Sequence, residues 1–207
     1  MQKKISSNSK AKKGKERKAS VKKMYREIEV RFLEVPIQTL KQNLATARAQ
    51  DLGERLLEEV ILYDEERRWV QSNKRLRLRT SQGKTHLSYK HHQKNTATGT
   101  QEIEVEVGNE KLTQAILEQL GFIVARKQQK RRHTFLLDGV TIDIDTWPTL
   151  PAYVELEGES EKALKQVAQK IGLNWNDVVF ESPRTIIVNR YNVPLDSLKC
   201  FTFETIE

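Results

Sequence analysis

Charged and apolar residues alternate one by one near the start of this chain. From Glu27 to Phe32 the sequence reads EIEVRF, so that Glu27, Glu29 and Arg31 share one side and the apolar residues share the other. Successive side chains of a β-strand point to opposite faces, and the alternation has the period of a strand rather than of a helix. The segment therefore predicts a strand with one apolar face and one face that carries two carboxylates and a guanidinium.

The same pattern recurs along the chain, and several of the charged rows carry a single sign. The rows are Arg75, Arg77 and Arg79; His86, Ser88 and Lys90; Glu102, Glu104 and Glu106; Lys130, Arg132 and Thr134; Asp143 and Asp145; and Glu155 and Glu157. A half-exposed antiparallel sheet also has a polar face, but like charges on opposed strands destabilise it. A solvated sheet face and a closed sheet with a charged interior both remain open. We favour the closed sheet, because eight strands enclose a space just wide enough for side chains or one small ligand.

Eight strands, mostly joined in sequence by hairpin turns, follow from these segments and the turn residues between them. Ser81–Lys84 and Asp138–Gly139 are typical hairpin turns, whereas Phe122–Lys127 and Lys130–Leu137 are expected as separate extended segments. Strands that follow one another in this way are typical of an antiparallel α+β fold rather than of alternating βαβ units. We expect an eight-stranded antiparallel β-barrel with helices packed outside.

Helices are expected at three places in this pattern. Helical spacing follows Pro36 up to Gly53, runs from about Glu110 to Leu120, and returns from about Ser160 to Ile171. Beyond Leu173 the pattern is less clear, and the short apolar run Thr185–Asn189 fits either a strand or the end of a helix.

The positive net charge comes from the first residues of the chain. Of the net charge of +8, residues 1–23 carry +9, which leaves −1 for residues 24–207. The first stretch is rich in lysine and serine and poor in apolar residues, so we expect a disordered basic tail before one folded domain over 24–207. The tail fits a solubilising leader, and it also fits an arm that makes weak contacts with nucleic acid or another polyanion.

Composition disfavours several classes of protein. The single cysteine, Cys200, excludes an internal disulfide framework and a cysteine zinc site. No apolar run approaches the length of a membrane span, and the lysine-rich start lacks the apolar segment of a signal peptide. A cytoplasmic protein without membrane contact is expected.

Carboxylates and bases clustered in one interior indicate a site for a metal and a phosphate. Mg²⁺ and Mn²⁺ take oxygen ligands, and the arginine fork suits phosphate oxygens. Opposite charges have to neutralise one another there, because an unpaired buried charge is very costly. None of the nine glycines has the spacing of a phosphate-binding loop, so side chains would hold the phosphates.

Six motifs, in this order, resemble those of the CYTH superfamily, the triphosphate tunnel metalloenzymes. The motifs are the ExExK-like Glu27–Arg31; Arg77 and Arg79 of LRLR; Lys90 of LSYK; Glu102 and Glu104 of EIE; Lys130 and Arg132 of KRRHTF; and Asp145, Glu155 and Glu157 of DTWPTLPAYVELEG. The resemblance spans about Met24 to Ile171. It implies an eight-stranded antiparallel tunnel that binds a triphosphate end-on, with metal at one side.

The resemblance gives each motif residue an expected role. It implies that Glu27, Glu29 and Glu157 are the principal metal ligands and that Glu102, Glu104, Asp145 and Glu155 are supporting or second-metal carboxylates. It implies a phosphate clamp of Arg31, Arg77, Arg79, Lys90, Lys130 and Arg132. Glu29, Asp145 and Arg31 are the residues expected to take part in catalysis. For each residue, an ordinary ion pair inside the tunnel remains the alternative.

Three positions depart from the family pattern. Arg31 stands where the family has lysine, and a guanidinium is hardly ever deprotonated, so we expect it to bind phosphate rather than activate water. Thr100 stands two residues before Glu102, where relatives often have arginine. Trp147 lies in a proline-rich turn where many relatives have glycine, and it fits either stacking on a base at the tunnel mouth or plain packing.

The resemblance implies metal-dependent hydrolysis of an inorganic, nucleoside or thiamine triphosphate, with Mg²⁺ or Mn²⁺ as cofactor. A class IV adenylyl cyclase, which makes cyclic AMP and pyrophosphate from ATP, would use the same clamp. We favour the triphosphatase, because no residue clearly meets the demand for adenosine recognition. A non-catalytic binder of polyphosphate or nucleotide and an RNA triphosphatase aided by the basic tail also remain open, as do a monomer and a homodimer.

Overall fold

The computed structural model describes residues 26–207, and the basic tail expected over 1–23 lies outside the described residues. The strands are β1 (Arg26–Glu27), β2 (Glu29–Phe32), β3 (Gln50–Asp64), β4 (Lys74–Ser81), β5 (Lys84–His92), β6 (Thr100–Val107), β7 (Phe122–Leu137), β8 (Val140–Thr146), β9 (Tyr153–Glu157) and β10 (Cys200–Phe201). The helices are α2 (Ile37–Thr46), α3 (Arg68–Gln71), α4 (Glu110–Gln119), α5 (Glu161–Lys170), the 3₁₀-helix η1 (Trp175–Asp177) and α6 (Pro183–Asn189).

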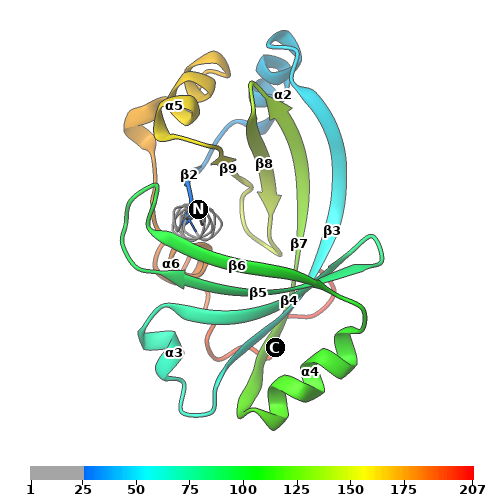
Figure 1. Cartoon of the computed structure of the whole chain (residues 1–207). Coiled ribbons are helices and arrows are strands. Elements are labelled where there is room, and N and C mark those ends of the chain that lie inside the picture. Colours follow the sequence, from blue (N-terminus) through cyan, green and yellow to red (C-terminus); the bar gives the residue numbers. More distant parts are fainter. Residues whose placement is uncertain (1–25) are drawn as a thin grey trace, which may run out of the picture.

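The sheet closes on itself through the first strand of the fold (Figure 1). Its order is β1-β6-β5-β4-β3-β7-β8-β9-β2, and only Ile28 separates β1 from β2 in the chain. The two ends of the order therefore belong to one continuous segment, which gives eight strands around a barrel. All pairs along this path are antiparallel, and β10 joins the edge of β7 in parallel. The predicted α+β fold with an eight-stranded antiparallel barrel is confirmed.

Two tight hairpins set the register of neighbouring strands. Gln82 and Gly83 between β4 and β5 both have positive φ, at 50° and 76°, and Asp138 and Gly139 between β7 and β8 have the same values. Positive φ at both central residues is the conformation whose twist matches the twist of the strands, and glycine adopts it without steric cost. These turns hold the alternating side chains of each pair on matching faces.

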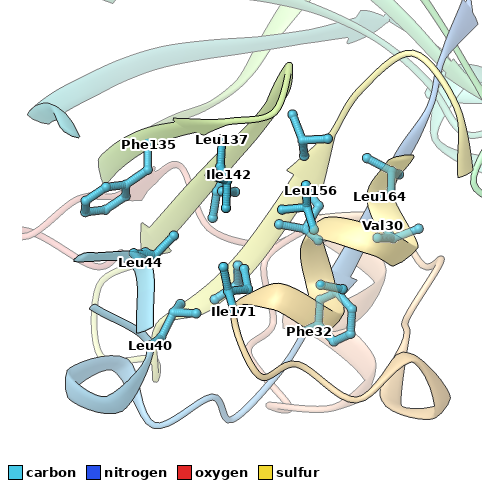
Figure 2. Close-up of a cluster of buried hydrophobic side chains, with 14 of the residues drawn as sticks. Val30, Phe32, Leu40, Leu44, Phe135, Leu137, Ile142, Leu156, Leu164 and Ile171 are labelled. Carbon is cyan, nitrogen blue, oxygen red and sulfur yellow. The ribbon is translucent and has the colours of Figure 1, made fainter. Parts of the chain in front are cut away.

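Helices α2 and α5 cover the outer face of β2, β8 and β9 (Figure 1). Leu40 and Leu44 of α2 and Leu164 of α5 are almost or fully buried against the outward side chains of these strands. Figure 2 shows this cluster, in which Val30 lies among the aliphatic side chains that the helices contribute. Burying each of these side chains contributes about 2 kcal/mol. The apolar halves of β2, β8 and β9 thus pack against helices on the outside of the barrel.

Smaller apolar clusters complete the outside of the barrel. Trp69 of α3 makes edge contacts with Tyr89 of β5 and Phe122 of β7, with ring centroids 5.6 Å and 5.0 Å apart. A third cluster joins Trp147 to the C-terminal residues Ile187 and Phe201. None of the helices in the described part of the chain is long and apolar enough to cross a membrane.

Two expected boundaries differ from the structure, and one alternative that the sequence left open is decided. The helix that follows Pro36 ends at Thr46 instead of reaching Gly53, because Arg48 takes a left-handed conformation with φ of 59° and the chain then enters β3. The two extended segments expected over Phe122–Lys127 and Lys130–Leu137 form one long strand, since β3 pairs with β7 along nearly its whole length. The apolar run Thr185–Asn189 belongs to helix α6, which Pro183 begins and Ser182 caps.

Candidate active site

Strand register brings the charged rows into line on the inner face of the barrel. Across β4, β5 and β6 the opposed residues form the rows Arg75–Lys90–Glu102 and Arg77–Ser88–Glu104. Across β2, β9 and β8 they form the rows Glu29–Glu157–Thr141 and Arg31–Glu155–Asp143. The wall formed by β4, β5 and β6 therefore carries most of the bases of these rows, and the wall formed by β2, β9 and β8 carries most of their carboxylates.

These rows surround a cavity of about 190 Å³, which we call the main cavity. All the predicted site residues line it except Asp145, and Arg75 and Pro183 line it as well. Residues from β1, β2, β4, β5, β6, β7 and β9 thus meet in one space. Nine of the ten charged residues in these rows line this space, which argues against an ordinary solvated sheet face.

Carboxylates crowd together on one wall of the main cavity. Glu29 lies directly opposite Glu157 across β2 and β9, and Glu27 lies two residues before Glu29. Enclosure by the barrel and the charge of Glu155 raise the pKa of Glu157 to about 7, although its side chain remains solvent-accessible. Burial raises the pKa of Glu27 to about 9 against the opposing charge of Lys90. Burial is the largest cause for both residues, because removal from water disfavours the charged form of a carboxylic acid.

Arg31 is the best-connected cation on this wall. It is 2 % exposed, and its Nη2 atom lies 2.5 Å from Glu155 and 2.8 Å from Glu29. Burial acts to lower its pKa, but the charges of Glu155 and Glu29 outweigh burial and raise it. Its Nη1 atom donates to the carbonyl oxygen of Glu181, while its buried Nε–H has no partner within residues 26–207. An unused buried donor of this kind fits a site that receives an anion.

The opposite wall carries Lys90 and two arginines of β4. Lys90 Nζ lies 3.0 Å from Glu27 and 2.7 Å from Glu102, so it joins β1 to β6. Arg77 is 5 % exposed and bonds to Glu102 at 3.1 Å, while Arg79 bonds to a further carboxylate, Glu59, at 2.9 Å. The charged group of each of these bases lies in the interior, where it could bind phosphate oxygens.

Asp145 does not reach the main cavity, contrary to the expectation that it binds metal or takes part directly in catalysis. It is fully buried, and its oxygens accept hydrogen bonds from Lys130 at 2.6 Å and from Arg132 at 2.6 Å and 2.7 Å. Lys130 and Arg132 lie between this carboxylate and the cavity that they line. Asp145 therefore orients two members of the predicted phosphate clamp from behind.

The surroundings of Lys130 lower the pKa of its ammonium group towards neutral pH. Burial, followed by the nearby charge of Arg132, lowers the pKa of Lys130 to about 8. Its ammonium group also lies 5.4 Å from the ring centre of Trp147. Trp147 is 4 % exposed and stacks on Phe201, so it packs inside the protein and does not stand at a tunnel mouth.

Three inward charges were not among the predicted site residues. Glu59 is 4 % exposed and takes hydrogen bonds from Arg79 and Gln128, and Arg77 lies beside it at 3.4 Å. Arg75 was visible in the RLRLR row, but no family motif marked it. Arg126 lies in FIVARK, where only its parity with Lys130 and Arg132 placed it on the inner face. Glu59 shares its parity with the apolar residues Leu57 and Ile61, so this row shows no charged pattern from which the inward position of Glu59 could be predicted.

The carboxylates already have internal partners. Among residues 26–207, no three carboxylate or histidine groups converge on one point as metal ligands. Arg31 holds Glu29 and Glu155, and Lys90 holds Glu27 and Glu102. The acidic wall thus has the oxygen donors that a hard divalent ion prefers, in ion pairs with bases that could instead bind phosphate.

A family model of the CYTH domain matches residues 25–179, which is most of the chain. The chain belongs to the CYTH domain family. This family binds triphosphate substrates with divalent metals, and it includes triphosphatases and class IV adenylyl cyclases. A comparison with curated proteins found no match.

Solved structures share the fold. The PH1012 protein of Pyrococcus horikoshii OT3 is 26% identical with a TM-score of 0.64, and the match covers 75% of this chain and 96% of that one. A candidate adenylate cyclase of Vibrio parahaemolyticus is 19% identical with a TM-score of 0.66, covering 78% of this chain and 97% of that one. A candidate adenylyl cyclase of Hippeastrum with a dominant triphosphatase activity is 17% identical with a TM-score of 0.56, covering 84% of this chain and 99% of that one.

Proposed function

We propose that this protein hydrolyses a triphosphate in the main cavity with the help of a divalent cation. The observation that carries the proposal is the meeting of an acidic wall and a basic wall in one enclosed space of about 190 Å³. A triphosphate alone would be repelled by the carboxylates, and a metal ion alone would be repelled by the bases. Their complex satisfies both walls.

The acidic wall is the proposed metal site. Glu27, Glu29 and Glu157 would hold Mg²⁺ or Mn²⁺, supported by Glu102, Glu104 and Glu155. The crowding of carboxylates supports this assignment, since a divalent cation would offset the repulsion between Glu29 and the opposed Glu157. A bound divalent cation would offset negative charge on the phosphate that is cleaved.

The basic wall is the proposed phosphate clamp. Arg77, Arg79 and Lys90 would bind the chain from β4 and β5, and Lys130 and Arg132 from β7. Arg31 would turn from Glu29 and Glu155 towards a phosphate oxygen, which frees both carboxylates. Holding the chain in line and neutralising charge in the transition state is the main task of a protein in phosphoryl transfer.

Proton transfer falls to the acidic wall in this proposal. Glu29 would accept a proton from the water that attacks the terminal phosphorus. The bond from this phosphorus to the bridging oxygen breaks, so orthophosphate forms and the remaining diphosphate chain is the leaving group. Arg31 stays protonated throughout because of its guanidinium chemistry, so it serves as a phosphate ligand. Asp145 contributes by fixing Lys130 and Arg132, to which it is bonded.

Cyclisation of ATP is the second candidate function. It needs the ribose 3′-hydroxyl to attack the α-phosphate while pyrophosphate leaves, and the same clamp could hold the chain. The likeness to the candidate cyclase of Vibrio parahaemolyticus keeps this alternative in view. Hydrolysis is favoured because Trp147, for which stacking on a base was one of two interpretations, is buried against Phe201. A binding protein without activity is the third candidate.

Product analysis separates the three candidates. Purified protein is supplied with Mg²⁺ or Mn²⁺ and in turn with tripolyphosphate, ATP, GTP and thiamine triphosphate, and the products are followed by phosphorus NMR. Orthophosphate release is the expected result and would rank the substrates. Pyrophosphate together with a cyclic nucleotide would make the protein a cyclase. Binding without turnover of any substrate would leave a binding protein.

A further inference from the structure

A second, smaller chamber lies beside the main cavity. Its volume is about 40 Å³, and it shares Arg75, Arg77, Lys130 and Pro183 with the main cavity, so the two spaces are neighbours along the interior. Arg126, Trp147 and Leu195 are among the residues that line only the smaller chamber. A space of this size holds a few waters or the oxygens of one phosphoryl group, and it has no room for a nucleobase.

Most cations around the smaller chamber have a carboxylate partner. Arg77 lies by Glu59 at 3.4 Å, and Lys130 lies by Asp145 at 2.6 Å. Arg184, which also lines the chamber, forms an ion pair with Asp196. These pairs neutralise the charges that take part in them.

Arg126 is the exception that matters most. It is 3 % exposed, yet its two hydrogen bonds go to neutral groups, the side-chain oxygen of Gln128 at 2.8 Å and the carbonyl oxygen of Leu195 at 2.6 Å. Within residues 26–207 no carboxylate oxygen lies within 4.0 Å of its guanidinium, and the same is true of Arg75. Burying a cation without a counter-ion is costly, so a fold that keeps one has a use for it.

We propose that Arg75 and Arg126 form a subsite for the terminal phosphoryl group of the phosphate chain that the main cavity holds. This inference rests on the proposed function. The unpaired guanidinium groups supply the positive charge and the donors that a dianionic phosphoryl end requires. Neither residue belongs to the six family motifs, so the subsite is a feature of this chain's own sequence.

The subsite gives the bound chain a direction. The carboxylates Glu27, Glu29 and Glu157 line only the main cavity, whereas Arg126 lines only the smaller chamber. A chain with its free end on Arg126 therefore runs from the smaller chamber into the main cavity, and the bond next to its terminal phosphorus lies where the two spaces meet, beside Arg77 and Lys130. The protein selects ligands with an unsubstituted phosphoryl end, whether the chain is inorganic or carries a nucleoside at its far end.

Paired ligands test this selection directly. Linear tripolyphosphate and cyclic trimetaphosphate both contain three phosphorus atoms, but only the linear form has a free end. ATP and diadenosine triphosphate form a second pair, in which only ATP has a free phosphoryl end. Binding of each is measured by calorimetry on the full chain, with Ca²⁺ as the divalent cation so that the metal–phosphate complex forms while turnover is slowed, for the wild type and for Arg126→Gln and Arg75→Gln.

The matched control is Arg131→Gln, which removes the same charge from the same strand. Arg131 is exposed on the outside of β7, where it lies over the ring of Phe203. Arg126→Lys keeps the charge but loses the fork, so it should bind with intermediate affinity. The melting temperature of Arg126→Gln without ligand checks that this variant folds, because it loses the hydrogen bonds to Gln128 and Leu195 together with the charge.

The expected result is that Arg126→Gln and Arg75→Gln bind tripolyphosphate and ATP about tenfold or more weakly than the wild type. Their affinity for trimetaphosphate and diadenosine triphosphate should be unchanged, and Arg131→Gln should behave as the wild type. Wild-type affinity of both variants for the linear chains, or an equal loss for all four ligands, would overturn the subsite while leaving the proposed function in place. A wild type that binds none of the four would overturn the proposed function itself.

Discussion

Single buried charges set the balance of the barrel interior, and Glu59 is the clearest case. It is 4 % exposed and lies among Arg77, Arg79 and Gln128, which belong to β4 and β7. Burial by itself would raise its pKa, but Arg79 and then Arg77 lower it well below the ordinary value. One carboxylate therefore neutralises two members of the proposed clamp while the clamp is empty.

Replacing Glu59 by glutamine should destabilise the protein at neutral pH. The change leaves Arg77 and Arg79 without their shared counter-ion, which costs about 3 kcal/mol for a buried ion pair. The free energy of unfolding is measured by urea titration at pH 7. Glu58→Gln is the control, because Glu58 is the exposed neighbour on the same strand. Equal stability of the two variants would contradict the account of Glu59.

Low pH should reveal how much the same ion pairs contribute to stability. A carboxylate with a lowered pKa in the folded state stabilises the protein above its unfolded pKa of about 4.3, and this stabilisation is lost as the pH falls below that value. Below about pH 4.5, the free energy of unfolding of the wild type should therefore fall more steeply with decreasing pH than that of Glu59→Gln. Urea titrations at a series of pH values give the two slopes, and parallel slopes would show that Glu59 is not the group responsible.

At the scale of elements, the strands could be predicted well because their pattern is local. Alternation in EIEVRF and RLRLR fixed which residues turn inward, and closure followed from the single sign of each row. Asp145 has the inward parity too, but its place behind Lys130 and Arg132 depends on side chains from another strand. The end of α2 at Thr46 depends on the left-handed conformation of Arg48. Arginine has no particular preference for this conformation, so the sequence did not predict it.

The segment beyond Val179 could not be predicted, because its structure depends on distant partners. It lies after the family match, which ends at residue 179. The carbonyl oxygen of Glu181 bonds to Arg31, that of Leu195 bonds to Arg126, and β10 pairs with β7. These contacts join residues that are far apart in the sequence, so no periodic pattern in the sequence predicts them. This segment nevertheless helps to build both cavities, through Pro183.

Removing the aromatic anchor of this segment should loosen it. Phe201 is fully buried and stacks on Trp147 with ring centroids 6.1 Å apart. Phe201→Ala should lower the free energy of unfolding by about 3–5 kcal/mol, as deletion of a buried aromatic ring does. Ile206→Ala is the control, because Ile206 is 45% exposed, and it should change stability by less than about 0.5 kcal/mol. Equal effects in thermal or urea unfolding would place Phe201 outside the core.

For the whole molecule, the two charged walls make metal and phosphate chain partners in binding. Magnesium relieves repulsion among carboxylates, and tripolyphosphate neutralises the bases, while each also attracts the other. A ligand that binds only the folded state stabilises it by about 2.7 kcal/mol at a hundred times its dissociation constant. The melting temperature is measured with neither ligand, with each, and with both, using Ca²⁺ if turnover has to be slowed. The rise with both should exceed the sum of the separate rises; a smaller rise would mean that the walls act independently.

The most direct test of metal-dependent hydrolysis is the rate of orthophosphate release from tripolyphosphate as Mg²⁺ or Mn²⁺ is titrated into the wild type and Glu29→Gln. We expect no release in EDTA, recovery when the metal is restored, and a rate at least about 100-fold lower for Glu29→Gln, because it lacks a proposed metal ligand. Glu58→Gln, changed on the outside of the barrel, should hydrolyse like the wild type. Release that continues in EDTA, or an undiminished rate for Glu29→Gln, would contradict the proposal that the acidic wall binds the metal for this reaction.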